Sequence, residues 1–362
     1  MISISQPWLD NKEKQAVMAV LDSGQLAQGP KTQELETKLA KLCETKYALA
    51  VNSGTAALHC ALASLNLKSG DEVVTTPFTF IATANAILMA GAKPVFADIE
   101  YSSFNLDPKE VAKKITLRTK AILTVNLYGQ PANYQELHLL AKKHHLKIIE
   151  DGAQSIGASY KNKFSGNLGD LGCFSFYATK NIMCGEGGAI VTSNKRYYET
   201  MKCFRHHGQN ADKPYQYFDL GYNYRLTDLQ AALALVQLDR LQDINKRRQQ
   251  IALMYEKGLS KIPGLVTPLI LPNRSHVFHQ YTVRITKNFP ITRDQLKERL
   301  LQKGIGSGIY YPIPLHKARH FEARGENLKT AEQAAKEVLS LPVHPQLTNE
   351  QIEFVIKAIK KI

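Results

Sequence analysis

The chain has 362 residues, with 44% hydrophobic and 22% charged side chains, which is ordinary for a globular protein and long enough for two domains. The N-terminal sequence shows no signal peptide, and the longest apolar stretch, near residues 81–97, is too short and too interrupted to span a membrane, so we expect a cytoplasmic protein. The net charge of +14 would attract polyanions, but the basic residues are spread along the chain without a nucleic-acid-binding motif, so we expect neither nucleic acid nor a membrane as a partner.

Between about residues 33 and 200 the sequence alternates helical patterns with short apolar runs. This alternation predicts a parallel sheet flanked by helices, in which ligands gather at the carboxyl ends of the strands. The expected helices cover residues 35–42, 56–65, 80–90 and 134–144. The expected strands cover residues 47–51, 71–75, 94–97, 121–125, 147–150 and 189–191.

The C-terminal third of the sequence shows a different order of helical and strand patterns. A long helical pattern over about 227–260 is followed by four prolines between residues 263 and 290, an alternating strand at 280–285, and amphipathic helices at 293–303 and 349–361. We therefore expect a large α/β domain with an N-terminal arm over residues 1–245, and a smaller α+β domain over residues 246–362.

The first stretch with chemical meaning follows the strand at 47–51. Its small residues Ser53, Gly54 and Thr55 open a helix, where free backbone N–H groups can bind an anion. An ordinary helix cap is the alternative, because serine and threonine favour that position in any case. The spacing matches neither a P-loop nor a dinucleotide-binding glycine motif, so neither a nucleoside triphosphate nor a dinucleotide is expected.

Two further stretches contribute an acid and a lysine. Asp151 follows the apolar strand at 147–150 and is expected to point into the ligand crevice, unless it only caps the next helix. Lys180 follows an apolar and aromatic run that begins at Cys173, and desolvation there would lower its pKa and make its amine a nucleophile. A lysine in a structural salt bridge is the alternative.

The three stretches together fit pyridoxal phosphate (PLP). This cofactor needs a lysine for its aldehyde, donors for its phosphate and an acid beside its pyridine nitrogen. Ser175, five residues before Lys180, could add a hydroxyl to the phosphate site, and Phe80 could cover one face of the ring. The five cysteines are scattered without a Cys-x-x-Cys pair and the histidines are not clustered, so we expect neither a disulfide framework nor a metal site.

Six motifs run in order along the chain: Asn-Ser-Gly-Thr-Ala-Ala-Leu-His (52–59), Pro-Phe-Thr-Phe-Ile-Ala-Thr-Ala-Asn-Ala (77–86), Glu-Asp-Gly-Ala-Gln (150–154), Phe-Ser-Phe-Tyr-Ala-Thr-Lys (174–180), Gly-Glu-Gly-Gly-Ala (185–189) and Gly-Tyr-Asn-Tyr-Arg-Leu (221–226). In them the sequence resembles the DegT-type (DegT/DnrJ/StrS) nucleotide-sugar aminotransferases, over essentially the whole chain. The resemblance implies the PLP-dependent fold type I, with a mainly parallel seven-stranded sheet in the large domain, and a homodimer whose active sites lie at the subunit interface.

The resemblance also implies a role for each matching residue. Lys180 would form the Schiff base with PLP and later carry a proton, and Asp151 would pair with the pyridine nitrogen. Gln154 would lie against one side of the ring and Phe80 against the other. The residues expected to hold the phosphate are Gly54, Thr55, Ser175 and, from the neighbouring subunit, Asn223.

Contacts with the substrate are expected from the C-terminal half. The matching positions are Arg225, Tyr310, Tyr311 and His316. Many relatives have histidine where Tyr310 stands, and for His316 a structural role is an equal alternative.

The implied activity is a two-step amino transfer. An amino donor, glutamate in the family, leaves its nitrogen on the cofactor, and a keto-sugar nucleotide then takes it, with a UDP- or dTDP-linked 3- or 4-keto hexose as substrate. The pathway implied is amino-sugar or surface polysaccharide biosynthesis. One alternative is a PLP-dependent sugar dehydratase on the same fold, although such relatives typically carry histidine in place of the lysine at Lys180. A non-catalytic regulator that binds PLP or a sugar is the other.

Overall fold

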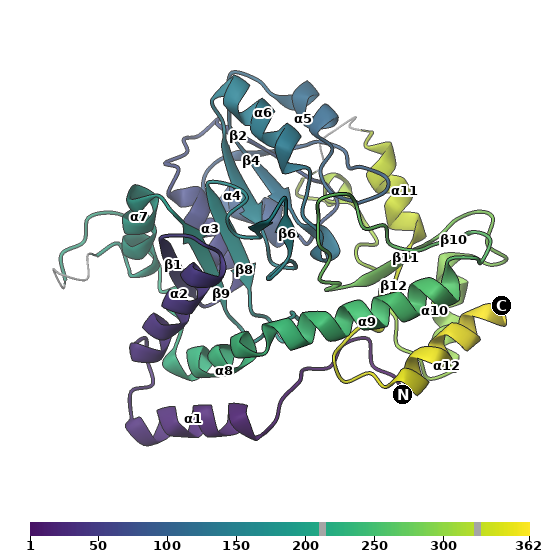
Figure 1. Ribbon diagram of the computed structural model, residues 1–362. Coiled ribbons are helices and arrows are strands. Elements are labelled where there is room, and N and C mark those ends of the chain that lie inside the picture. The colour runs from purple at the N-terminus through teal and green to yellow at the C-terminus, as the bar shows by residue number, and fades with distance from the viewer. Residues whose placement is uncertain (210–214, 322–326) are drawn as a thin grey trace.

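A seven-stranded sheet forms the centre of the computed structural model, which describes residues 1–209, 215–321 and 327–362 (Figure 1). The strand order is β1-β9-β8-β5-β4-β2-β3, and neighbouring strands are parallel except for β9, which runs antiparallel to both of its neighbours. The strands are β1 Tyr47–Val51, β2 Glu72–Thr75, β3 Lys93–Phe96, β4 Thr119–Val125, β5 Lys147–Asp151, β8 Leu171–Ser175 and β9 Gly188–Thr192. The predicted α/β class with a mainly parallel sheet is confirmed.

Two features of this sheet do not follow from the sequence pattern. The run Leu171–Ser175 forms β8 although it contains a glycine and no β-branched residue, so its local preference for a strand is weak. The antiparallel direction of β9 is decided by its pairing with β1 and β8, which no local pattern reports.

Both faces of the sheet are buried, as expected for parallel strands. Successive side chains alternate between the faces: Leu49 and Val51 pack into the core on one side of β1, and Ala48 and Ala50 pack into the core on the other. The first face is covered by α3 Gly54–Ala63, α4 Ala82–Met89 and α7 Lys195–Arg205. The second is covered by α2 Pro30–Leu42, α5 Pro108–Lys114, α6 Tyr134–His144 and α8 Asp228–Asp239. The sheet is therefore the middle of three layers (Figure 1).

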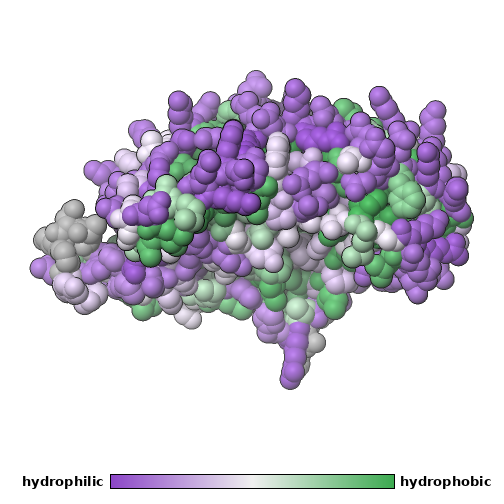
Figure 2. All heavy atoms as spheres, turned by 90° about the horizontal axis from the view of Figure 1, so that it is seen from below, coloured by the Kyte–Doolittle hydropathy of each residue, from purple (hydrophilic) through white to green (hydrophobic). Residues whose placement is uncertain are grey.

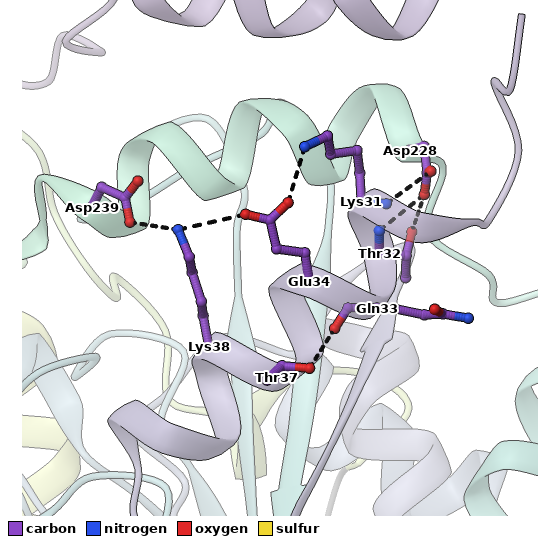
Figure 3. A network of polar contacts seen from close by, with 8 residues as sticks. All are labelled: Lys31, Thr32, Gln33, Glu34, Thr37, Lys38, Asp228 and Asp239. Atoms are coloured by element: carbon purple, nitrogen blue, oxygen red, sulfur yellow. Dashed lines mark hydrogen bonds and ion pairs between the residues drawn. The ribbon is translucent and has the colours of Figure 1, made fainter. Parts of the chain in front are cut away.

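The start of α2 is held on α8 by the buried carboxylate of Asp228 (Figure 3). This carboxylate accepts hydrogen bonds from the backbone N–H groups of Gly29, Lys31 and Thr32 at 2.8, 3.0 and 2.9 Å. The hydroxyl of Thr32 donates a further bond at 2.7 Å. These N–H groups open α2, where the helix itself offers them no acceptor, so Asp228 fixes the start of α2 on α8.

The long helical pattern predicted over 227–260 is two helices in the structure. The break lies at Arg240, between α8 and α9 Leu241–Leu259. The start of α9 packs against the core of the large sheet through Leu241 and Ile244, whereas Ile251 and Tyr255 belong to the core of the C-terminal part. Residue 245 thus lies inside a continuous helix that joins both cores, and the division at this residue stays a prediction.

A second, antiparallel sheet lies in the C-terminal part of the chain. It has three strands in the order β10-β11-β12, which are β10 Leu265–Val266, β11 Tyr281–Ile285 and β12 Val338–Leu341. Its helices are α10 Arg293–Gln302, α11 Lys329–Glu337 and α12 Asn349–Lys360. The N-terminal helix, α1 Asn11–Ser23, packs on α8 at the opposite end of the molecule (Figure 1), and a two-stranded hairpin is formed by β6 Ser159–Tyr160 and β7 Lys163–Phe164.

The surface carries mixed hydrophilic and apolar side chains. Figure 2 shows one face, on which hydrophilic residues dominate the rim and smaller apolar patches lie between them. In the described part of the chain, no helix combines the length and the apolar character needed to cross a membrane.

Candidate active site

The carboxyl ends of three strands bring the predicted site residues together. β1 ends at Val51, β5 at Asp151 and β8 at Ser175, and these three strands run in the same direction. Gly188 of β9 pairs with both Val51 and Ser175, while β5 pairs directly with β8. The turn at 53–55, the acid and the serine, which are far apart in the sequence, therefore meet at one edge of the sheet.

A cavity of about 730 Å³ lies at this edge. The predicted residues that line it are Gly54, Thr55, Phe80, Asp151, Gln154, Ser175, Lys180, Tyr310 and Tyr311. The wall is completed by side chains from other parts of the chain, among them Ile4 and Ser5 near the N-terminus and His279 and Gln280 just before β11. The cavity thus draws on the N-terminal segment, the edge of the large sheet and the C-terminal part.

Lys180 lies in the turn that follows β8, where its backbone N–H donates to the carbonyl of Tyr177 at 2.8 Å. Burial lowers the pKa of its amine to about 8, and the negative charge of Asp151 opposes this shift. No ion pair of Lys180 is found among the described residues, so the structure does not support the salt-bridge alternative. At mildly alkaline pH much of this amine is neutral and able to act as a nucleophile.

Asp151 lies on the wall of the same cavity with only 5% of its surface exposed. Its Oδ2 accepts a hydrogen bond from the hydroxyl of Thr83 at 2.8 Å, and its Oδ1 accepts one from the backbone N–H of Ala153 at 3.2 Å. Burial raises the pKa of this carboxyl, and the two hydrogen bonds and the charge of Lys180 hold it down. The carboxylate is thus buried with a defined orientation.

The side chain of the neighbouring Glu150 points to the opposite face of β5. There it forms hydrogen bonds with the loop that follows β7. Its Oε1 accepts hydrogen bonds from Asn126 Nδ2 at 2.7 Å, the Ser165 hydroxyl at 2.5 Å and the Gly166 N–H at 2.8 Å. Burial raises the pKa of Glu150 to about 7, against the effect of these donors. Asn126 in turn donates its backbone N–H to the carbonyl of Asp151, so this network supports the strand end that carries Asp151.

The start of α3 has the properties of both a helix cap and an anion site. Ser53 Oγ caps the helix by accepting the N–H of Ala56 at 3.1 Å, while the N–H groups of Gly54 and Thr55 have no acceptor among the described residues. A Cβ at Gly54 would lie 2.8 Å from that of Ser175, so only glycine allows this close approach. Two free N–H groups and a serine hydroxyl therefore adjoin one another, as an anion requires.

Aromatic and amide side chains line another part of the cavity. The rings of Phe80 and Tyr311 lie 6.3 Å apart, and Phe80 is 58% exposed within the open site. Gln154 is held by the N–H of Tyr128, which donates to its Oε1 at 2.7 Å, and its Nε2 donates to the Tyr311 hydroxyl at 3.4 Å. Burial, and then the charge of Asp151, raises the pKa of Tyr311. A planar ligand would meet both an aromatic face and a fixed amide here.

Three of the predicted residues do not line the cavity. His316 is buried, and its Nε2 lies 3.0 Å from Glu332 of α11, an arrangement that matches the structural alternative. Arg225 Nη1 lies 2.6 Å from His206 Nδ1. Asn223 is exposed. None of the three lines the cavity of its own chain, and their roles stay predictions.

Sequence reasoning missed several residues of the site. Thr83 lies three positions after Phe80, within a motif that the sequence does single out, and from the first turn of α4 its hydroxyl donates to Asp151. His279 and the N-terminal Ile4 and Ser5 lie in stretches without any recognisable pattern. Among the described residues no group of three or more His, Cys, Asp or Glu side chains could hold a metal ion.

Known proteins resemble this chain in sequence and in fold. The model of the DegT/DnrJ/EryC1/StrS aminotransferase family matches residues 7–360. The chain is 41% identical to the pleiotropic regulatory protein of Geobacillus stearothermophilus, over 98% of this chain and 97% of that protein. It is 38% identical to the UDP-2-acetamido-2-deoxy-3-oxo-D-glucuronate aminotransferase of Pseudomonas aeruginosa, over 98% and 97%. The crystal structure of S. venezuelae DesV in complex with a ketimine intermediate superposes with a TM-score of 0.92 at 38% identity, over 97% of this chain and 94% of that one.

Proposed function

This chain belongs to the DegT/DnrJ/EryC1/StrS aminotransferase family, and from that premise we propose that it transfers an amino group to a keto-sugar nucleotide with PLP bound at Lys180. The observation that carries the proposal is the meeting of Lys180, Asp151 and the start of α3 in one cavity. The amino donor that we propose is L-glutamate, and the location that we propose is the cytoplasm.

The residues of the cavity fit PLP on chemical grounds. When bound, this cofactor supplies an aldehyde that condenses with amines and a ring that takes up electrons from the substrate carbon. The free N–H groups of Gly54 and Thr55, with the Ser175 hydroxyl, offer donors for a phosphate. Asp151 offers a buried carboxylate for a protonated pyridine nitrogen, and Thr83 keeps that carboxylate oriented.

Lys180 has two functions in this proposal. Its amine, with a pKa of about 8, is the group that anchors the cofactor. Once the amino donor has displaced it, the same amine is free to take a proton from the donor carbon and to return one to the sugar carbon. Both functions need Nζ to change protonation near neutral pH, which the lowered pKa allows.

The substrate side of the cavity is proposed to include Tyr310 and Tyr311. Both line the cavity, and the hydroxyl of Tyr128 donates to the backbone carbonyl of Tyr310, which fixes this segment. The name of the P. aeruginosa relative specifies a UDP-linked 3-oxo sugar, which supports a keto-sugar nucleotide as the substrate class. We leave UDP and dTDP, and the 3- and 4-keto positions, as alternatives to be screened.

We also propose a homodimer in which Asn223 completes the partner's site. Asn223 is exposed and does not line the cavity of its own chain. Large apolar side chains gather in the segment just before it, where Tyr215, Tyr217, Phe218 and Leu220 are each at least 60% exposed. Such a patch is typical of a surface that another chain covers.

The test begins with glutamate and the purified holoenzyme. We expect the absorbance band of the lysine-bound cofactor to disappear while 2-oxoglutarate forms, and a panel of keto-sugar nucleotides to restore the band as an amino sugar appears in the mass spectrum. Lys180→Ala should lack the band and all turnover, whereas Lys163→Ala, which removes an exposed lysine of β7, should keep both. A full band with full turnover in Lys180→Ala would overturn the assignment.

The same experiment separates a regulator from an enzyme. The G. stearothermophilus relative is named a pleiotropic regulatory protein, which keeps a PLP-binding regulator as a second candidate. A regulator would retain the band of the bound cofactor when glutamate is added and would form no 2-oxoglutarate.

A further inference from the structure

The N-terminal end of the chain passes from the C-terminal part of the fold to α8, and we call its residues 2–8 the N-terminal strap. At its start the backbone N–H of Ile2 donates to the carbonyl of Gly304 at 2.7 Å. At its end the carbonyl of Trp8 accepts a hydrogen bond from Gln237 Nε2 of α8 at 2.7 Å. The residues between these two anchors are therefore held at a defined place in the fold.

Two glycines allow the strap to lie directly against the segment that follows α10. A Cβ at Gly306 would lie 3.0 Å from the carbonyl oxygen of Ile2 and 3.1 Å from the backbone nitrogen of Ile4, and a Cβ at Gly308 would lie 2.8 Å from Cδ1 of Ile4. Gly308 is itself paired with Ser340 of β12, through its N–H at 3.1 Å and its carbonyl at 2.7 Å. The side chain of Ile4 thus lies against a backbone that the second sheet fixes.

The middle of the strap forms part of the cavity wall, where Ile4 and Ser5 both line the cavity. Ring atoms of Tyr310 lie 2.6 and 2.7 Å from the same Cβ position at Gly308 that Ile4 approaches, so Ile4 and Tyr310 are neighbours on this wall. A separate, narrow crevice is lined by both Ser5 and Lys180. The strap therefore extends from the surroundings of Lys180 to those of Tyr310.

The side chain of Ile4 suits only one kind of ligand surface. Isoleucine neither donates nor accepts a hydrogen bond, so a charged group that left water to lie against it would cost free energy. A C–H face of a sugar ring or a methyl substituent is stabilised in the same position. The sugar has to bring its carbonyl carbon to Lys180, and the strap lies between Lys180 and Tyr310. Ile4 consequently borders the sugar part of a sugar nucleotide.

We propose that Ile4 is a specificity-determining residue: its side chain packs against an apolar part of the keto sugar and so selects which sugar nucleotides the enzyme uses. The inference rests on the proposed function, because it concerns the sugar that receives the amino group. The anchors at Ile2 and Trp8 hold this part of the wall in place, and the bare backbone of Gly308 gives the Ile4 side chain its seat.

Steady-state kinetics of the holoenzyme, with the best keto-sugar nucleotide of the panel, give the first test. Ile4→Ala removes most of the side chain, so we expect kcat/KM to fall about tenfold, mainly through KM, since Ile4 moves no proton. Ile4→Val keeps both γ carbons and should stay within about threefold of wild type. The half-reaction with glutamate, which carries no sugar, should change less than about twofold in Ile4→Ala.

The matched control is Ile2→Ala, the same substitution two residues earlier in the strap. Ile2 packs against the core of the C-terminal part and does not line the cavity. It should leave kcat/KM for the sugar nucleotide unchanged. Trp8 is the only tryptophan of the chain, and the guanidinium of Arg240 lies 5.3 Å from its ring centroid. An unchanged tryptophan emission in both variants shows that the strap is still seated on α8.

Calorimetry of the holoenzyme tests the same contact without turnover. The probes are UDP with UDP-glucose and dTDP with dTDP-glucose, which have no keto group to react. In Ile4→Ala we expect the sugar nucleotide to bind about tenfold more weakly and the nucleotide diphosphate alone to stay within about twofold of wild type. If neither sugar nucleotide binds the wild type, the kinetic comparison decides.

Three results would refute the role of Ile4. These are an unchanged kcat/KM in Ile4→Ala, an equal loss in Ile2→Ala, and an equal weakening of the nucleotide diphosphate and the sugar nucleotide. If Ile4→Ala does not fold, Ile4→Leu, which keeps the volume but moves the branch, should change the ranking of the sugar panel, and an unchanged ranking would count against the proposal.

Failure of the proposed function looks different. If the wild type forms no 2-oxoglutarate from glutamate, the amino transfer fails, while calorimetry still reports whether Ile4 contacts the sugar. If amino transfer occurs and Ile4→Ala matches the wild type in both measurements, only the role of Ile4 fails.

Discussion

Replacing Thr83 by valine should weaken cofactor binding through the charge state of Asp151. Valine has nearly the shape of threonine, so the change removes the 2.8 Å hydrogen bond to Oδ2 and leaves one longer bond, from Ala153, on the carboxylate. A hydrogen bond to a charged group contributes about 1.5–3 kcal/mol, so we expect the affinity for PLP to fall by about tenfold to hundredfold near neutral pH.

The direction of the pH dependence follows from the same bond. Burial already raises the pKa of Asp151, and the bond from Thr83 opposes this, so its loss raises the pKa further. The pyridine nitrogen needs the ionised acid. The affinity deficit of the variant should therefore be largest at mildly acidic pH and shrink as rising pH ionises the carboxyl in both proteins.

The assay is equilibrium titration of the cofactor-free chain with PLP, followed by absorbance at several pH values. Thr124→Val is the matched control, because the hydroxyl of this buried threonine of β4 has no hydrogen-bond partner in the described structure. It should bind PLP like wild type. Equal affinities of Thr83→Val and wild type, or a deficit that does not change with pH, would refute the reasoning.

Three further predictions test other parts of the structure. Because the neutral amine of Lys180 is the nucleophile, its rate of condensation with PLP should rise with pH up to about 8 and then level off; a rate independent of pH would contradict the lowered pKa. Asp228→Ala leaves three N–H groups of α2 without their acceptor and should cost about 3 kcal/mol in urea unfolding, whereas Asp239→Ala, at an exposed ion pair of α8, should cost less than about 1. Tyr311→Phe removes the hydroxyl near Gln154 and should slow turnover several-fold in steady-state kinetics without unfolding the protein.

The sequence contained most of what the site needs, because the relevant properties are local. The strand at 47–51 followed by small residues, the acid at a strand end and the lysine after an apolar run are each visible within a few residues. Alternation of helical and strand patterns was enough for the α/β class, since each pattern reports which faces of an element are buried. The resemblance to a family joined these pieces into one cofactor site.

Local sequence patterns failed to indicate two features of the fold. The helical stretch predicted over 227–260 is divided at Arg240, because the residues on both sides have helical patterns and no local pattern marks the break between them. The strand Leu171–Ser175 has only a weak local preference for a strand and forms because β5 and β9 offer it hydrogen bonds on both sides.

The amino-acid sequence already contains the chemical groups of the site, which are an amine, an acid and phosphate donors, and it indicates the α/β scaffold that presents them. Which side chains surround these groups depends on how the whole chain folds. Thr83 reaches Asp151 across 68 residues, and His279 lines the same cavity as Lys180 although 99 residues separate them in the chain. Such contacts depend on the order of the strands in the large sheet and on how the C-terminal part packs beside the carboxyl ends of those strands. Burial and hydrogen bonding between distant segments set these arrangements, and no short stretch of sequence records them.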